Sequence, residues 1–110
     1  MTLLTGVGEV MSGDYNRGIS YYKRGAYDKA IADYTEAIRL DRKSATAYVN
    51  RGRCYAEKNE PNKAIADFTE AIRLVPTNPT FYASRALVYR ALGDDAKTTS
   101  DEKRARELKW

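Results

Sequence analysis

Acidic side chains are the most abundant groups in this chain that could do acid–base chemistry, but their usual catalytic companions are missing. Asp and Glu number 15 in 110 residues, whereas His is absent and Cys54 is the only cysteine. Catalysis by carboxylates, hydroxyls or thiols usually needs a histidine, a paired thiol or a phosphate-cradling glycine loop beside them. Because the sequence offers none of these, we expect no enzyme, no metal site and no cofactor.

A second set of charged residues recurs regularly. Three arginines lie 34 residues apart, and three aspartates keep the same interval: Arg17, Arg51 and Arg85, with Asp33, Asp67 and Asp101. Repeated arginines could form a ladder for phosphates. Aspartates repeating in step favour internal ion pairs instead, which need hydrogen bonding when they are buried.

The same interval of 34 residues governs the whole chain. Residues 29–40 read KAIADYTEAIRL, residues 63–74 read KAIADFTEAIRL, and a fainter third copy follows. Their apolar side chains are one and three residues apart, which places them on one face of a helix. We therefore place repeats at about 11–44, 45–78 and 79–110, in a domain of residues 13–110 after an amino-terminal extension of residues 1–12.

Turn and cap residues divide each repeat into two helices. They are two glycines, two prolines and three polar cap residues: Gly25, Gly93, Pro61, Pro79, Ser44, Asn78 and Asp94. Six helices are predicted, at about 13–26, 27–41, 45–58, 61–74, 79–92 and 94–109.

In the extension, four apolar residues fall on one helical stripe: Leu3, Leu4, Val7 and Met11. This pattern predicts an ordered segment rather than a loose tail.

The spacing of small and aromatic residues resembles that of the tetratricopeptide repeat family. The first copy comprises Gly18, Tyr21, Ala30, Tyr34 and Ala37, and the second repeats it with Gly52, Tyr55, Ala64, Phe68 and Ala71. The resemblance implies an all-α fold in which three antiparallel helical hairpins stack as a right-handed superhelical α-solenoid. Small residues let helices approach closely, so we expect Gly18 to meet Ala30 and Gly52 to meet Ala64.

The last helix departs from the pattern, because polar residues replace the apolar ones of the second repeat. They are Thr98, Thr99, Glu102 and Arg106, in place of Ala64, Ile65, Phe68 and Ile72. We expect this helix to act as the polar end cap that a stacked array needs for solubility.

In this family the first helices of the hairpins line a concave groove that holds a peptide. The resemblance carries the groove positions to Tyr15, Asn16, Ile19, Tyr22, Lys23, Val49, Asn50, Arg53, Ser84, Leu87 and Arg90, together with Glu57 and Ala83. These residues could simply be the solvated side of three helices. We favour the groove because Tyr15, Ile19 and Leu87, like Val49, have no evident reason to stay in water.

Asn16 and Asn50 recur at the repeat distance, and an amide can donate to and accept from a peptide backbone at once. A structural hydrogen bond to a neighbouring helix is an equal alternative.

Some relatives hold a carboxy-terminal carboxylate with lysine, asparagine, asparagine, lysine and arginine. The matching residues here are Tyr15, Ile19, Asn50, Thr80 and Ser84. Only Asn50 is kept, which argues against a clamp for chaperone tails.

The leading hypothesis is a protein–protein interaction module that binds a peptide segment of a partner, with cations in the groove favouring an acidic segment. One alternative is a structural module that self-associates as a homo-oligomer. Another is an RNA-binding helical repeat that uses Arg53, Arg90 and the basic last helix. The net charge is +4, yet the cations are mostly interspersed with acids, which makes nucleic acid the weaker reading. Without a signal sequence or an apolar run of about 20 residues, a cytoplasmic location and no membrane contact are expected.

Overall fold

The structure is a computed structural model that describes residues 15–109, and all regular structure in this range is α-helical. Residues 15–23 form a first helix within the described range. The labelled helices that follow are α2 (Tyr27–Leu40), α3 (Ala45–Glu57), α4 (Pro61–Leu74), α5 (Pro79–Ala91) and α6 (Asp95–Lys109). The all-α expectation is confirmed, whereas the predicted extension of residues 1–12 and its apolar stripe lie outside the described residues.

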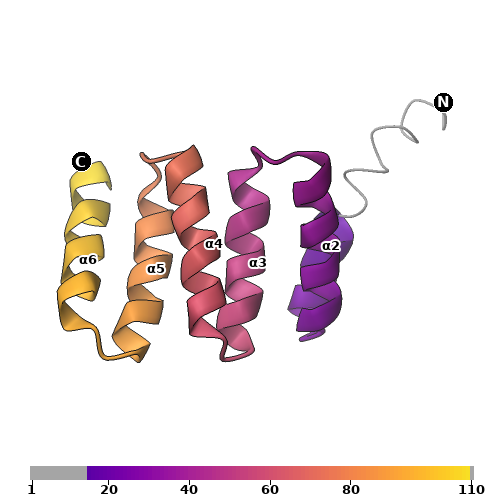
Figure 1. The fold of residues 1–110 in the computed structure, drawn as a ribbon, viewed down its shortest axis with the longest axis horizontal. Helices are drawn as coiled ribbons and strands as arrows, with labels where there is room; N and C mark the ends of the chain where they lie inside the picture. Colours follow the sequence, from indigo (N-terminus) through magenta and orange to yellow (C-terminus); the bar gives the residue numbers. More distant parts are fainter. Residues whose placement is uncertain (1–14, 110) are drawn as a thin grey trace.

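Helices α2 to α6 stand side by side in one row, joined by short turns that alternate between the two ends of the helices (Figure 1). Each helix packs on its neighbours in sequence, and α3 also contacts α5. Successive helices are therefore antiparallel, and the contacts among α2–α6 link each helix to its neighbours within a hairpin or in the next hairpin, as expected for a stacked array.

Helix boundaries follow the predicted cap and turn residues. Side-chain oxygens of Ser44, Asn78 and Asp94 accept hydrogen bonds from backbone N–H groups in the first turns of α3, α5 and α6. The N···O distances are 3.3, 2.9 and 3.1 Å. Gly25 and Gly93 have a φ of 79°, in the left-handed region that glycine tolerates at little cost. The local signals thus determine where each hairpin turns.

The apolar core consists of two clusters, one at each junction between hairpins. The first joins Ala30 and Tyr34 to Cys54, and therefore lies between the first and second repeats. The second lies between α3, α4 and α5 and comprises Ala45, Val49, Ala64, Phe68, Ala71, Phe81 and Val88. Because each cluster draws on two repeats, burial of apolar surface couples neighbouring hairpins rather than stabilising any one alone.

The two helical glycines make a close approach to the facing helix, and the nearest side-chain atoms come from aromatic rings. A Cβ on Gly18 would lie 2.9 Å from Cε1 of Tyr34, and one on Gly52 would lie 2.8 Å from Cε1 of Phe68. The nearest atoms thus belong to the aromatic rings, not to Ala30 or Ala64. The glycines are needed because the aromatic ring of the facing helix leaves no room for a Cβ at either position.

The predicted ion pairs between the arginine and aspartate series are confirmed. Arg51 donates Nε–H and Nη2–H to the two carboxylate oxygens of Asp67, both at 2.8 Å. Its remaining nitrogen donates to Oγ1 of Thr35 at 3.2 Å, so one side chain joins three helices. Hydrogen bonding to Asp67 raises the pKa of the Arg51 guanidinium, which keeps this group charged although it is largely buried.

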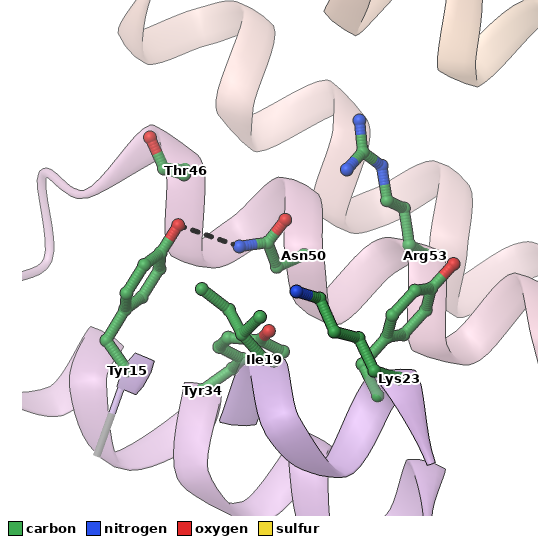
Figure 2. A pocket seen from close by; sticks show the side chains of 8 residues that line it. Tyr15, Ile19, Lys23, Tyr34, Thr46, Asn50 and Arg53 are labelled. Atoms are coloured by element: carbon green, nitrogen blue, oxygen red, sulfur yellow. Dashed lines mark hydrogen bonds between the residues drawn. The ribbon is translucent and has the colours of Figure 1, made fainter. Parts of the chain in front are cut away.

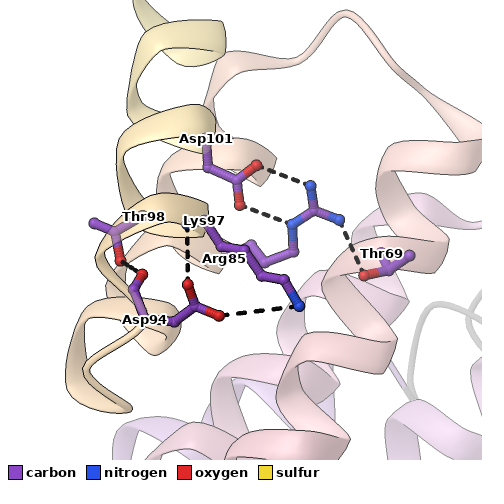
Figure 3. Close-up of polar contacts among 6 residues, drawn as sticks. All are labelled: Thr69, Arg85, Asp94, Lys97, Thr98 and Asp101. Atoms are coloured by element: carbon purple, nitrogen blue, oxygen red, sulfur yellow. Dashed lines mark hydrogen bonds and ion pairs between the residues drawn. The ribbon is translucent and has the colours of Figure 1, made fainter.

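The third repeat copies this arrangement. Arg85 binds both oxygens of Asp101 at 2.8 Å and Oγ1 of Thr69 at 3.1 Å (Figure 3). In the first repeat Arg17 makes the same two-pronged contact with Asp33, at 2.9 and 2.8 Å, but its side chain is 57% exposed. The phosphate-ladder alternative is thereby excluded for Arg51 and Arg85, whose guanidinium groups are already used.

The last helix buries little apolar surface. In α6 the buried residues are Thr98 and Asp101, and the Thr98 hydroxyl donates to the carbonyl of Asp94 at 2.8 Å (Figure 3). The polar character of this helix therefore agrees with the predicted end cap.

Candidate functional site

A cavity of about 410 Å³ opens between the first helix and α3. Figure 2 shows the side chains that converge on it from these two helices and from α2. Its lining consists of Tyr15, Ile19, Tyr22, Lys23, Tyr34, Thr46, Asn50 and Arg53. We call this space the first cavity. Its floor is apolar and aromatic, with polar groups at its margin, which is the composition typical of ligand sites.

The two sides of the first cavity are bridged by a hydrogen bond. The side-chain N–H of Asn50 donates to the hydroxyl of Tyr15 at 2.9 Å (Figure 2). The structural alternative for Asn50 is thus realised in the free protein. Within the described residues its carbonyl oxygen accepts no hydrogen bond, so the amide keeps an acceptor and a second N–H for a peptide backbone.

Two cations border the first cavity without an acidic partner. Lys23 and Arg53 form no ion pair with any residue in the range 15–109. Burial raises the pKa of Tyr22, and the nearby Glu57 raises it further. The tyrosine therefore remains a neutral phenol that can donate a hydrogen bond, and the positive charge belongs to the cations alone.

A second cavity of about 240 Å³ continues toward α5. It is lined by Tyr22, Arg53, Ala56, Glu57, Phe68, Ser84, Leu87 and Val88. Because Tyr22 and Arg53 line both cavities, the two cavities adjoin and together form a surface that touches all three repeats. We call it the concave groove.

Most of the predicted groove residues meet in this space. The first cavity contains Tyr15, Ile19, Tyr22, Lys23, Asn50 and Arg53, and the second adds Ser84, Leu87 and Glu57. Asn16 is exposed but lines neither cavity.

Two predicted groove residues are placed differently. Val49 is only 3% exposed and packs in the core cluster between α3, α4 and α5, so it does not present its side chain to a ligand. The next hairpin covers this position and shields the valine from water, which explains why an apolar residue is found there. Arg90 is paired with Glu102 of α6, so its charge is already balanced.

Sequence reasoning missed several lining residues, namely Tyr34, Thr46, Ala56, Phe68 and Val88. The sequence pattern assigned Tyr34 and Phe68 to packing only, yet each also lines one of the two cavities. A signal for Thr46 was available, because Thr80 repeats it 34 residues later at the start of α5.

The described residues offer little for metal or thiol chemistry. Between residues 15 and 109, no group of three or more Cys, Asp or Glu side chains is arranged to hold a metal ion. Burial raises the pKa of the Cys54 thiol to about 11, so the reactive thiolate is scarce near neutral pH. None of the helices in this range is both long enough and apolar enough to cross a membrane.

The tetratricopeptide repeat model matches residues 15–79, which is more than half of the chain. The chain belongs to the tetratricopeptide repeat family. Its all-helical fold is accordingly the right-handed solenoid of stacked hairpins that the sequence pattern predicted. No curated protein matched the chain in a sequence comparison.

Several solved structures of tetratricopeptide repeat domains have the same fold. The first such domain of Spaghetti (RPAP3), bound to the HSP90 peptide SRMEEVD, has a TM-score of 0.85 at 26% identity, covering 89% of this chain and 78% of that one. The TPR2B domain of yeast Sti1, in complex with pHsp70, has a TM-score of 0.86 at 26% identity, with coverage of 89% and 78%. The Arabidopsis OM64 domain reaches 0.86 at 29% identity, with coverage of 91% and 83%.

Proposed function

We propose that this chain is an interaction module that holds a peptide segment of a partner protein in the concave groove. The observation that carries the proposal is the convergence on one hollow surface of apolar side chains, an amide with spare hydrogen-bonding capacity and two cations that have no acidic partner among residues 15–109. The Spaghetti domain, bound to an HSP90 peptide, and the Sti1 domain, in complex with pHsp70, support this mode of binding.

The groove chemistry favours a segment that carries carboxylates. Lys23 and Arg53 attract acidic side chains, while Ile19 and the ring of Tyr22, both only partly buried, accept an apolar side chain. Of the carboxylate clamp found in some relatives only Asn50 is kept. We therefore infer that the groove takes an internal segment rather than a free carboxy terminus, and that SRMEEVD is not its ligand.

An RNA ligand has less support. Arg90 pairs with Glu102 and Arg104 pairs with Glu107, so two of the cations that a phosphate backbone would need are balanced by acids. Binding that weakened steeply with salt would favour RNA nonetheless, because counterion release dominates contacts with phosphates.

The test begins with a peptide selected from a displayed random library, which is then titrated by calorimetry against folded variants. Asn50→Ala is expected to cost about 0.5–1.5 kcal/mol of binding free energy through a lost hydrogen bond. Arg53→Glu is expected to weaken binding at least about tenfold, because it replaces attraction by repulsion. Lys103→Glu is the matched control, since Lys103 is an exposed cation of α6 that lines neither cavity.

Unchanged affinity in both groove variants would place the binding surface elsewhere. Equal losses in Arg53→Glu and Lys103→Glu would indicate a nonspecific charge effect. Tight binding of SRMEEVD would contradict the inference about the free carboxy terminus while leaving the groove itself in place.

A further inference from the structure

The face of α5 and α6 at the end of the array contains two further cavities, of about 400 and 250 Å³. The residues that both cavities share are Ala83, Leu87, Ala105 and Arg106, and Lys109 lines the smaller one. We call this surface the α5–α6 seat. The Leu87 side chain is 64% exposed there, so the surface presents apolar atoms to water.

The repeat shows which kind of element fits this surface. One repeat earlier, Val49 and Ala71 hold the positions of Ala83 and Ala105, and they are 3% and 0% exposed. They are covered because α5 packs on α3 and α4 in the second core cluster. The α5–α6 seat is therefore the equivalent landing place for a helix, and within the described residues nothing occupies it.

The charges of the seat restrict that helix further. Arg106 and Lys109 replace Ile72 and Val75 of the preceding repeat, and neither has an acidic partner among residues 15–109. A helix that lies in the seat must bring apolar side chains toward Leu87 and the alanines. It must also bring carboxylates toward the two cations.

We propose that the occupant is the amino-terminal segment, residues 1–14, of a second copy of this chain. The segment carries apolar residues at helical spacing: Leu3, Leu4, Val7, Val10 and Met11. Its only charged side chains are Glu9 and Asp14, whereas all 19 Lys and Arg residues and the other 13 acidic residues lie in 15–110, which gives that part a net charge of +6. As a helix it would be about 21 Å long, close to the 13-residue α5 that fills the preceding seat.

The source must be another copy because of where the segment joins the fold. It leads into Tyr15, which lies in the first repeat, at the opposite end of the row from α6 (Figure 1). A segment that is coiled into a helix cannot span the array and also fill the seat. Docking between copies is then head to tail, so it extends a chain of molecules rather than closing a dimer.

Sedimentation equilibrium of the full chain over a range of concentrations tests this proposal. The wild-type protein is expected to self-associate reversibly, and Arg106→Glu with Lys109→Glu is expected to weaken the association at least tenfold. The segment-side change Glu9→Lys with Asp14→Lys should weaken it equally. Combining all four changes should restore association, because the charges are exchanged. Lys103→Glu serves as the control, since it alters an exposed cation outside the seat.

A protein that stays monomeric at every concentration overturns the proposal, as does association that survives both charge reversals. Circular dichroism verifies folding, and the segment-side variant keeps the test decisive if changes in α6 disturb that helix. None of the substituted residues lines the concave groove, although the seat shares Ser84 and Leu87 with the second cavity. Titration of the selected peptide against the same variants therefore distinguishes a loss of self-association from a loss of peptide binding.

Discussion

The three arginine–aspartate pairs share one geometry but differ in their exposure. The Arg51 and Arg85 side chains are 19% and 18% exposed, whereas that of Arg17 is 57% exposed. Double-mutant cycles on thermal or denaturant unfolding, with both partners changed to Leu, should give a coupling of about 1–3 kcal/mol for Arg51–Asp67. The matched pair Arg17–Asp33 should give less than about 1 kcal/mol, because water screens it. Equal couplings would contradict the role assigned to burial.

Gly52 illustrates a glycine required by contact rather than by backbone angle. Gly52→Ala should destabilise the protein by about 1–3 kcal/mol, because the new methyl group would press on the Phe68 ring and outweigh the helix preference of alanine. Gly93→Ala is the control, because its Cβ meets nothing within 4 Å and only the φ of 79° opposes it. Urea unfolding measures both. A more stable Gly52→Ala protein would show that the ring can move aside.

Cys54 makes stability depend on pH in the alkaline range. Burial raises its pKa from 9.0 to about 11, so the folded state holds the proton more tightly than the unfolded state. The stabilisation is complete below pH 9 and is lost as pH rises to 11, by up to about 3 kcal/mol. Because the tyrosines also titrate there, the measurement is the difference between wild type and Cys54→Ala, whose free energy of unfolding should fall less steeply. Parallel curves would refute the assignment.

Residues that obey the 34-residue interval could be predicted from the sequence, including the caps at Ser44 and Asn78 and the ion pair of Arg51. Their partners are local or are fixed by the repeat itself. Val49 could not be placed, because whether the next hairpin covers a position depends on how hairpins stack. The contact of Arg51 with Thr35 was missed for the same reason, although threonine recurs at position 69.

At the scale of the elements, α6 stands apart because polar groups provide its attachment. Its buried residues are Thr98 and Asp101, and its start depends on Asp94, which accepts the N–H of Lys97. Asp94→Ala should therefore cost about 0.5–2 kcal/mol, and hydrogen exchange should accelerate in α6 before α4. Ser44→Ala at α3 is the comparison, since that helix is also anchored by apolar packing on both sides. Uniform acceleration along the chain would mean that α6 does not open separately.

The junctions between repeats hold the whole array together. The substitutions that destabilise it most should therefore be those of buried residues at these junctions. Phe68 is 2% exposed and belongs to the cluster shared by the second and third repeats. Phe68→Ala should cost about 3–5 kcal/mol and remove most cooperative unfolding, because three repeats are about the minimum for a stable stack. Circular dichroism during heating reports both effects. Loss of stability with an unchanged sharp transition would indicate a core that does not depend on this junction.

The threonine contacts of Arg51 and Arg85 also give the molecule a mechanical property. Each planar guanidinium is fixed to its own hairpin by two bonds, and its remaining nitrogen reaches the hairpin before it. Rotation of one hairpin against the next would stretch that third bond, so the arginines oppose changes in the pitch of the superhelix. The array should therefore resist bending, and its curvature should be the same with and without a ligand. It should bind segments that already fit this curvature rather than change shape to fit them.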